Sequence, residues 1–176
     1  IDENITKIKG ELSAIYPNVP LNWASNDHLS AFLYGGCIEE VVKVHDGFYK
    51  TGLKAGQPRL KNTIVTHNLP ALYKPVRGSE LKKAGYYATN EPTLRQLKGN
   101  TKIINLILEL ARLEKLNGTY YRGIPELNKK MNWEHGVLHS NFNLTQTATG
   151  RLSSSKPNQQ NFSSEILDIF ESRYNA

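Results

Sequence analysis

Cysteine and methionine are almost absent from this chain of 176 residues, which has one of each, Cys37 and Met131. A single cysteine cannot form an internal disulfide, so the sequence predicts a reducing compartment. The longest apolar stretch, residues 103–111, is interrupted by Asn105 and Glu109 and is too short to cross a bilayer. Residues 1–10 are acidic and polar, unlike a signal peptide. Residue 1 is isoleucine, from which we expect a trimmed or excised piece of a longer protein.

Acidic residues are scarce in one part of the chain. The net charge is +6. Between Lys50 and Lys83, eight basic residues stand against one acidic residue, Glu80, whereas residues 162–176 are net acidic. Concentrated positive charge favours a polyanionic partner. A solvated surface that only keeps the protein soluble is the alternative, and charge alone does not decide between them.

Hydrophobic periodicity predicts a mixed α+β fold. Apolar residues recur at helical spacing in residues 2–16, 25–34, 90–97 and 101–116, and Gly118 is expected either to end the last helix or to allow a close approach of backbone. Residues 37–90 read as short strands and turns rich in glycine and proline, with Asp46-Gly47 as a hairpin turn. From Met131 the period changes to two, so residues 137–144 are predicted to be a strand, the second of a hairpin. A further apolar-sided segment follows at 165–174.

The sequence contains no complete catalytic or metal-binding constellation. His135 and His139 are four residues apart, but on a strand this separation is roughly 13 Å. Residues 52–56 resemble a phosphate loop but lack its Gly-Lys-Ser/Thr ending. Ser153–Ser155 has no nucleophile elbow around it, and Asp168 with Glu171 is most simply a surface carboxylate pair. We therefore predict no catalytic residue and no metal ligand.

Residues 147–161 are rich in hydrogen-bond donors but contain no group that titrates near neutral pH. Arg151 offers five fixed donors, and Asn158, Gln160 and Asn161 add amide groups. Every base pair presents acceptors at nearly the same places in the minor groove, so such donors can test pair geometry without reading the base. The alternative is a polar loop whose side chains bond to its own backbone.

The order of motifs resembles family A DNA polymerases, the Pol I group. Thr147-Ala-Thr-Gly-Arg-Leu-Ser-Ser, followed by Pro157-Asn158 and Gln160-Asn161, is similar to the segment preceding the family's first catalytic motif. Residues 113–120 (LEKLNGTY) resemble the end of its long thumb helix, and residues 21–29 (LNWASNDHL) its early thumb. Residues 36–88 are similar to what phage-type members carry. The sequence departs from the family pattern at Gln159, Phe162 and Ser163, and at Gly118, where serine is common.

The resemblance implies a domain organisation and residue roles. It implies a helical thumb of long antiparallel helices over residues 1–128, with a basic insertion at 36–88. Residues 129–176 would be the N-terminal part of the palm, with a β-hairpin and loop. Arg151 would reach the minor groove at the primer terminus, and the three amides would contact the nearby duplex. The implied sugar-phosphate contacts from the thumb are Lys115, Asn117, Thr119 and Tyr120.

The function implied is that of a duplex-holding part of a DNA-directed DNA polymerase, a nucleotidyltransferase of DNA replication. The catalytic aspartates are missing, so the chain alone is expected to be inactive, and Mg²⁺ is expected only in the complete polymerase. The implied partners are primer–template DNA and the remaining polymerase domains, in the cytoplasm of a bacterial host if the protein is phage-encoded. A naturally split polymerase subunit or a free-standing DNA-binding module without sequence specificity remains the alternative. For the basic insertion, docking of a processivity factor and extra DNA contact both stay open.

Overall fold

The computed structural model describes residues 1–48, 50–51, 54, 56–134, 136–144, 150–162, 164–167 and 170. The chain forms two compact units, one of residues 6–110 and one of residues 1–5 with 111–176. The predicted α+β class is confirmed: helices, including one long helix, occur with a two-stranded antiparallel sheet. Each unit is described by itself.

The four helices predicted before residue 117 are present. They are α1 (Asp2–Ser13), α2 (Asn26–Tyr34), the single-turn α3 (Glu91–Leu94) and α4 (Thr101–Lys115). Ser25 caps α2 by accepting a hydrogen bond from the His28 N–H at 3.4 Å, and Gly35 ends it with a φ of 82°. Asn90 caps α3. These caps are local signals, which explains why the sequence located the helices correctly.

The core of unit 6–110 forms around α2. Leu12, Phe32 and Leu33 are fully buried. The Phe32 ring receives edge contacts from Tyr16 at 5.7 Å and Trp23 at 5.1 Å between ring centroids. Such aromatic pairs add about 0.5–1.5 kcal/mol beyond the apolar area that they bury. The α1–α2 connection is therefore part of the core.

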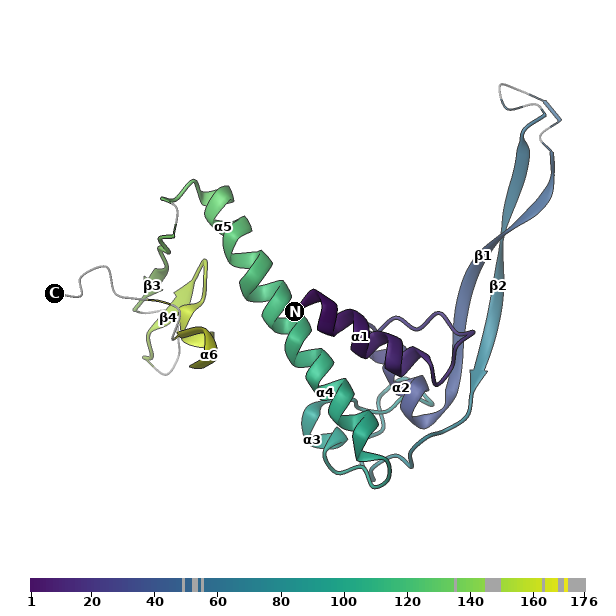
Figure 1. The fold of residues 1–176 in the computed structure, drawn as a ribbon, viewed down its shortest axis with the longest axis horizontal. Coiled ribbons are helices and arrows are strands. Elements are labelled where there is room, and N and C mark those ends of the chain that lie inside the picture. The colour runs from purple at the N-terminus through teal and green to yellow at the C-terminus, as the bar shows by residue number, and fades with distance from the viewer. Residues whose placement is uncertain are drawn as a thin grey trace. The chain divides into compact units, whose positions relative to one another are not determined.

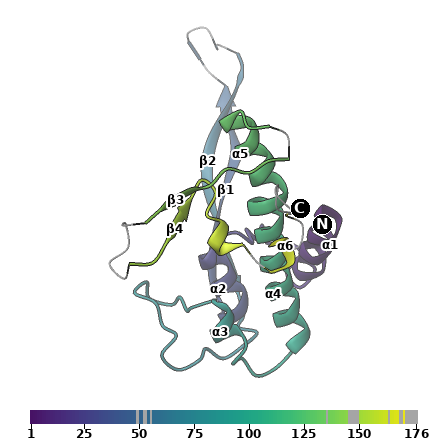
Figure 2. The same ribbon diagram turned by 90° about the vertical axis from the view of Figure 1, so that its left-hand side faces the viewer.

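A long β-ribbon leaves α2 (Figures 1 and 2). Strand β1 (Gly36–Phe48) pairs antiparallel with β2 (Pro58–Leu69), from Gly36 opposite Leu69 to Phe48 opposite Pro58. The prediction of short strands with a turn at Asp46-Gly47 is wrong, because both residues lie within β1. β-Branched residues recur in both strands and favour extended backbone, so Asp46-Gly47 forms an irregularity in the ribbon rather than its turn: the register shifts between His45 and Phe48, and Gly47 has a φ of 78°.

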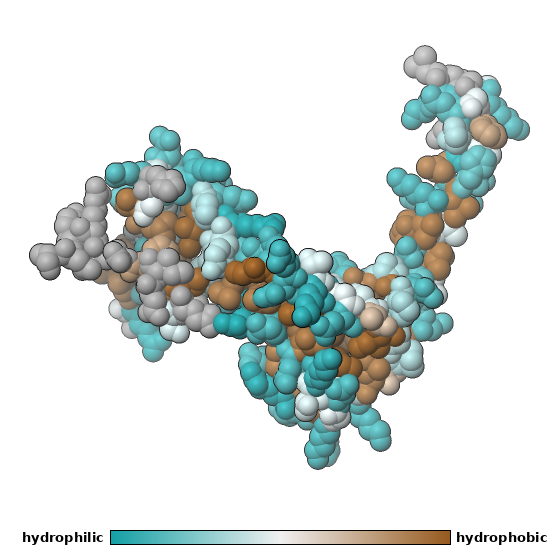
Figure 3. All heavy atoms as spheres, in the orientation of Figure 1, coloured by the Kyte–Doolittle hydropathy of each residue, from teal (hydrophilic) through white to brown (hydrophobic). Residues whose placement is uncertain are grey.

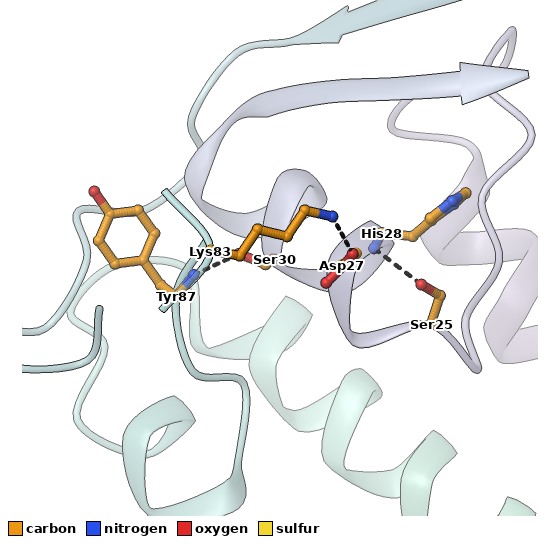
Figure 4. A network of polar contacts seen from close by, with 6 residues as sticks. All are labelled: Ser25, Asp27, His28, Ser30, Lys83 and Tyr87. Carbon is orange, nitrogen blue, oxygen red and sulfur yellow. Dashed lines mark hydrogen bonds and ion pairs between the residues drawn. The ribbon is translucent and has the colours of Figure 1, made fainter. Parts of the chain in front are cut away.

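The basic segment after β2 is fastened to α2 (Figure 4). Ser30, fully buried, accepts a hydrogen bond from the Tyr87 N–H at 2.9 Å. Lys83 Nζ lies 2.5 Å from Asp27 Oδ2 and 4.0 Å from the centre of the Tyr86 ring. The hydrogen bond from Lys83 to Asp27 raises the pKa of the lysine. This segment is therefore held by specific contacts.

The second unit contains a continuation of the long helix. After α4 the chain runs through a π-helical segment, η1 (Leu116–Arg122), into α5 (Gly123–Met131). α4 ends at Lys115, close to the predicted limit at residue 116, but the helical backbone does not stop at Gly118 and continues as a π-helix. The strand predicted over residues 137–144 is shorter than expected, because β3 covers only Asn141–Asn143. The local glycine signal is overridden because π-helical bonding carries the backbone past Gly118.

Short strands and turns complete this unit. Strand β3 (Asn141–Asn143) pairs antiparallel with β4 (Ser153–Ser155), so β3 is the first strand of its hairpin rather than the second. The 3₁₀ turn η2 (Gln159–Asn161) and the single-turn α6 (Ser164–Leu167) follow. Of the segment predicted at 165–174, residues beyond 167, apart from Phe170, lie outside the described residues.

Candidate nucleic-acid interface

All eight residues predicted to touch DNA belong to the unit of residues 1–5 and 111–176. Four lie at the α4–η1 junction and in η1, and four lie in the loop from 150 to 161. The side chains of six are exposed, whereas Asn117 is half-buried and Tyr120 is buried. The six exposed ones are Lys115, Thr119, Arg151, Asn158, Gln160 and Asn161.

The π-helical geometry of η1 depends on a glycine. The Gly123 N–H donates to the Gly118 carbonyl, five residues earlier, and to the Tyr120 carbonyl. A Cβ at Gly123 would lie 2.8 Å from the Gly118 oxygen, whereas a Cβ at Gly118 would meet nothing within 4 Å. Only Gly123 therefore has to be glycine for steric reasons. A π-segment inside an α-helix often marks a functional site, and this one carries Asn117, Thr119 and Tyr120.

Asp2 forms hydrogen bonds with two residues of η1. Its carboxylate accepts hydrogen bonds from Asn117 Nδ2 at 2.5 Å and from Arg122, whose Nη2 lies 3.1 and 3.0 Å from the two oxygens. The hydrogen bonds from Arg122 and then from Asn117 lower the pKa of Asp2. The side chain of Asn117 is thereby fixed at the surface of η1.

Tyr120 connects the helix to the loop. Its hydroxyl donates to the Asn161 carbonyl at 3.2 Å, and its ring, only 5% exposed, makes a perpendicular contact with Phe162 at 5.5 Å. Phe162 in turn stacks on Phe170. The predicted contact of Tyr120 with the DNA backbone stays a prediction, and the geometry shows a second role, which is to hold η2 against η1.

Serine hydroxyls organise the loop itself. Ser154 is 6% exposed; its hydroxyl donates to the Pro157 carbonyl at 3.2 Å and accepts from the Gln159 N–H at 3.2 Å. Ser140 donates to the same carbonyl at 2.8 Å. Ser154 is thus a structural residue, which agrees with the absence of a nucleophile elbow in the sequence.

The four predicted groove-contacting residues differ in how the structure uses them. The side-chain oxygen of Asn158 accepts a hydrogen bond from the Gln160 N–H. This bond does not use the side-chain NH₂ group of Asn158. Gln160 Nε2 donates to the Leu152 carbonyl at 3.0 Å, so contact with a base would require exchange of that bond. Asn161 contributes its carbonyl to Tyr120. Arg151 is exposed and makes a contact within the protein.

Metal binding and membrane insertion can be examined in the described part of the chain. There, no three His, Cys, Asp or Glu side chains come together in one group. His139 packs its ring edge against Trp133 at 5.5 Å. His135, Asp168 and Glu171 lie outside the described residues. No helix among the described residues is long and apolar enough to span a bilayer.

Sequence patterns alone did not reveal the residues that build this frame. Asp2 is 115 positions from its partner Asn117, and no local pattern announces such a pairing. Gly123 looks like an ordinary helix start, and its role follows only from the five-residue bond to Gly118. Phe162 departs from the family pattern, and its ring contact with Tyr120 explains why an aromatic residue fits there.

Comparison with known proteins gives the same class that the motifs suggest. Residues 63–173 match DNA polymerase family A. DNA polymerase I of Synechocystis is 46% identical over 104 residues, which is 59% of this chain and 10% of that protein. The thermostable DNA polymerase I of Thermus filiformis is 45% identical over 80 residues, 46% of this chain and 9% of its own length. DNA polymerase I of Deinococcus radiodurans is 45% identical over 80 residues, which is 46% of this chain and 8% of its own length.

A match over more than half of the chain establishes the class: this chain belongs to DNA polymerase family A. The matched stretches span about a tenth of the length of these relatives.

Proposed function

We propose that this chain is a duplex-holding part of a DNA-directed DNA polymerase. In this proposal η1 contacts the sugar-phosphate backbone, and the loop of residues 150–161 inspects the minor groove at the primer terminus. The complete polymerase would carry out synthesis with Mg²⁺ bound by residues other than those described. Its partners would be primer–template DNA and the other polymerase domains.

The observation that carries the proposal is the bond from Tyr120 to the Asn161 carbonyl. It joins the segment bearing Lys115, Asn117 and Thr119 to the loop bearing the amide donors, all within one compact unit. Phosphate contacts position a protein on a duplex, whereas groove contacts inspect it. A rigid link between the two sets would fix the loop at a set distance from the backbone that η1 grips.

The chemistry of the exposed donors also supports this division. Lys115 and Arg151 carry positive charges, and their N–H groups can donate hydrogen bonds to phosphate oxygens and to acceptor atoms of the bases. Asn158 and Asn161 are neutral and exposed, as a groove reader without sequence preference requires.

A salt titration of duplex binding tests the proposal. We expect the 176-residue chain to bind primer–template of unrelated sequences with similar affinity, and the affinity to fall steeply as salt rises. Lys115→Gln should reduce the slope of log K against log salt by about 0.9. Lys7→Gln, which removes an exposed lysine from the other unit, is the matched control. Affinity that is independent of salt would refute phosphate contact.

A primer-extension assay tests the division of labour. The chain alone, with Mg²⁺ and nucleotides, should extend no primer, and robust synthesis would contradict the assignment. The alternative of a free-standing DNA-binding module predicts equal affinity for duplex with and without a primer terminus. A clear preference for the primer terminus would exclude that module.

A further inference from the structure

The β1–β2 ribbon presents charge and apolar surface on both of its faces. Successive residues point to opposite faces of a strand, and the register places Lys43 opposite Asn62 and Lys61 opposite Val44. Lys43 and Lys61 therefore lie on different faces. Figure 3 shows hydrophilic and hydrophobic residues mixed along the visible face of the ribbon.

The outer half of the ribbon is strongly basic. Positions 43–61 contain five lysines and arginines and one acidic residue, Asp46. Asp46 is already paired with Arg59 at 3.0 Å. Among the described residues, no carboxylate pairs with Lys43 or Lys61, and both are exposed. Positive charge therefore remains uncompensated along this half.

Several large apolar side chains of the ribbon are exposed to water. Val41 and Ile64 lie opposite each other and are 62% and 61% exposed, and Leu60 is 55% exposed. An isolated two-stranded hairpin is marginally stable in water. The family match begins at Thr63, so β1 and the basic outer half lie outside it. The exposed apolar side chains and the marginal stability of such a hairpin therefore favour a binding partner for the ribbon. Most of the ribbon lies outside the part of the chain that matches the family.

We propose that the outer half of the β1–β2 ribbon is a second DNA-binding arm that enters a groove of the duplex. This rests on the proposed function and adds a second site to it. A two-stranded ribbon fits the major groove, about 12 Å wide, and a ribbon that enters it edge-on turns one face to each phosphate wall. A lysine on each face matches that arrangement. A protein partner would cover one face, and neither face is continuously apolar, because Lys43 with Asn62 separates the Val41–Ile64 pair from Leu60.

The reach of the ribbon sets the size of the expected contact. The outer half of β1, residues 43–48, is six residues long and at about 3.4 Å each extends roughly 20 Å. This corresponds to about 6 base pairs, at roughly 3.4 Å per pair. A test duplex of about 30 base pairs therefore leaves room for the ribbon as well as for the site at the primer terminus.

The test compares salt slopes of the full 176-residue chain on this duplex by fluorescence anisotropy. Lys43→Gln with Lys61→Gln should lower the slope by about 1.8, which is 0.9 for each lysine. The matched control, Lys7→Gln with Lys98→Gln, removes two exposed lysines elsewhere in the same unit and should leave the slope nearly unchanged. Lys43→Arg with Lys61→Arg keeps the charge and should bind as the unchanged chain does, which separates charge from folding.

Two outcomes overturn the proposal and differ in what else they affect. If the ribbon pair matches the control pair while the unchanged chain still loses affinity with salt, only the arm is refuted. The exposed Val41 and Ile64 would then point to a protein partner. If the unchanged chain shows no salt-dependent duplex binding, both the arm and the proposed function fail.

Discussion

Replacing Gly123 with alanine should disrupt the π-segment that carries Asn117, Thr119 and Tyr120. The added Cβ would lie 2.8 Å from the Gly118 carbonyl oxygen, a distance that real Cβ contacts essentially never show. That oxygen is a backbone atom and accepts the hydrogen bond from the Gly123 N–H. It cannot turn away as a flexible side chain would, so the π-turn must open. The backbone angles of Gly123, φ −66° and ψ −38°, suit alanine, so strain from φ and ψ is not the cause.

The expected cost follows from three terms. Overpacking of a close contact costs about 1–3 kcal/mol, and losing the Gly123–Gly118 hydrogen bond costs about 1 kcal/mol. Alanine in place of glycine in a helix returns about 0.5–1 kcal/mol. The net expectation is a destabilisation of about 1–3 kcal/mol. Gly118→Ala, with open space around its Cβ, should instead stabilise the chain by about 0.5–1 kcal/mol.

The assay is urea unfolding followed by far-UV circular dichroism, with duplex affinity measured on the same two variants. Gly123→Ala should unfold at lower urea and bind duplex more weakly, because Asn117 and Thr119 move with the opened turn. Gly118→Ala should unfold at higher urea and bind at least as well as the unchanged chain. If Gly123→Ala proves as stable as Gly118→Ala, the close approach in the π-turn does not exist and the reasoning fails.

Three further predictions concern the frame around the interface. Tyr120→Phe should lower the free energy of unfolding by about 1 kcal/mol, because it removes the hydroxyl that bonds to the Asn161 carbonyl; unchanged urea unfolding would contradict the link. Ser154→Ala should cost about 1 kcal/mol, since it removes the acceptor of the Gln159 N–H while the Pro157 carbonyl keeps its bond from Ser140; Ser155→Ala, as control, should cost little by the same assay. Asp2 has a lowered pKa in the folded state, so its ionised form stabilises the fold above the ordinary carboxyl pKa of about 3.9. That stability is lost as pH falls through the lower folded value; Asp2→Asn should therefore flatten the acid limb of stability against pH, and an unaltered limb would exclude the contribution.

The sequence predicted the helices whose signals lie within their own residues. The four N-terminal helices have caps or apolar stripes within their own residues, such as Ser25 for α2 and Asn90 for α3. The sequence also predicted the hydrogen-bond donors of the 150–161 loop, because the residue type alone shows which side chains carry N–H groups. Their exposure agrees with that hypothesis but does not test it.

The remainder depends on contacts between distant residues. The ribbon's length follows from pairing across 33 positions, Gly36 with Leu69, and this pairing overrides the turn tendency of Asp46-Gly47. The continuation of the helix past Gly118 depends on a five-residue backbone bond that no hydrophobic period reveals. The fixing of Asn117 by Asp2 joins the two ends of the unit. Composition and spacing could not have shown these three features.

The most direct test of the central claim uses a primer–template whose terminal purine lacks the N3 acceptor. A 3-deazapurine removes the minor-groove acceptor, and a 7-deazapurine, which removes a major-groove acceptor instead, is the control. In a polymerase containing this segment, the 3-deaza substitution should slow extension by about tenfold or more, the loss for one hydrogen bond from a charged group of about 1.5–3 kcal/mol. In Arg151→Ala the same substitution should have almost no further effect. An equal 3-deaza penalty with and without the Arg151 guanidinium would contradict the account.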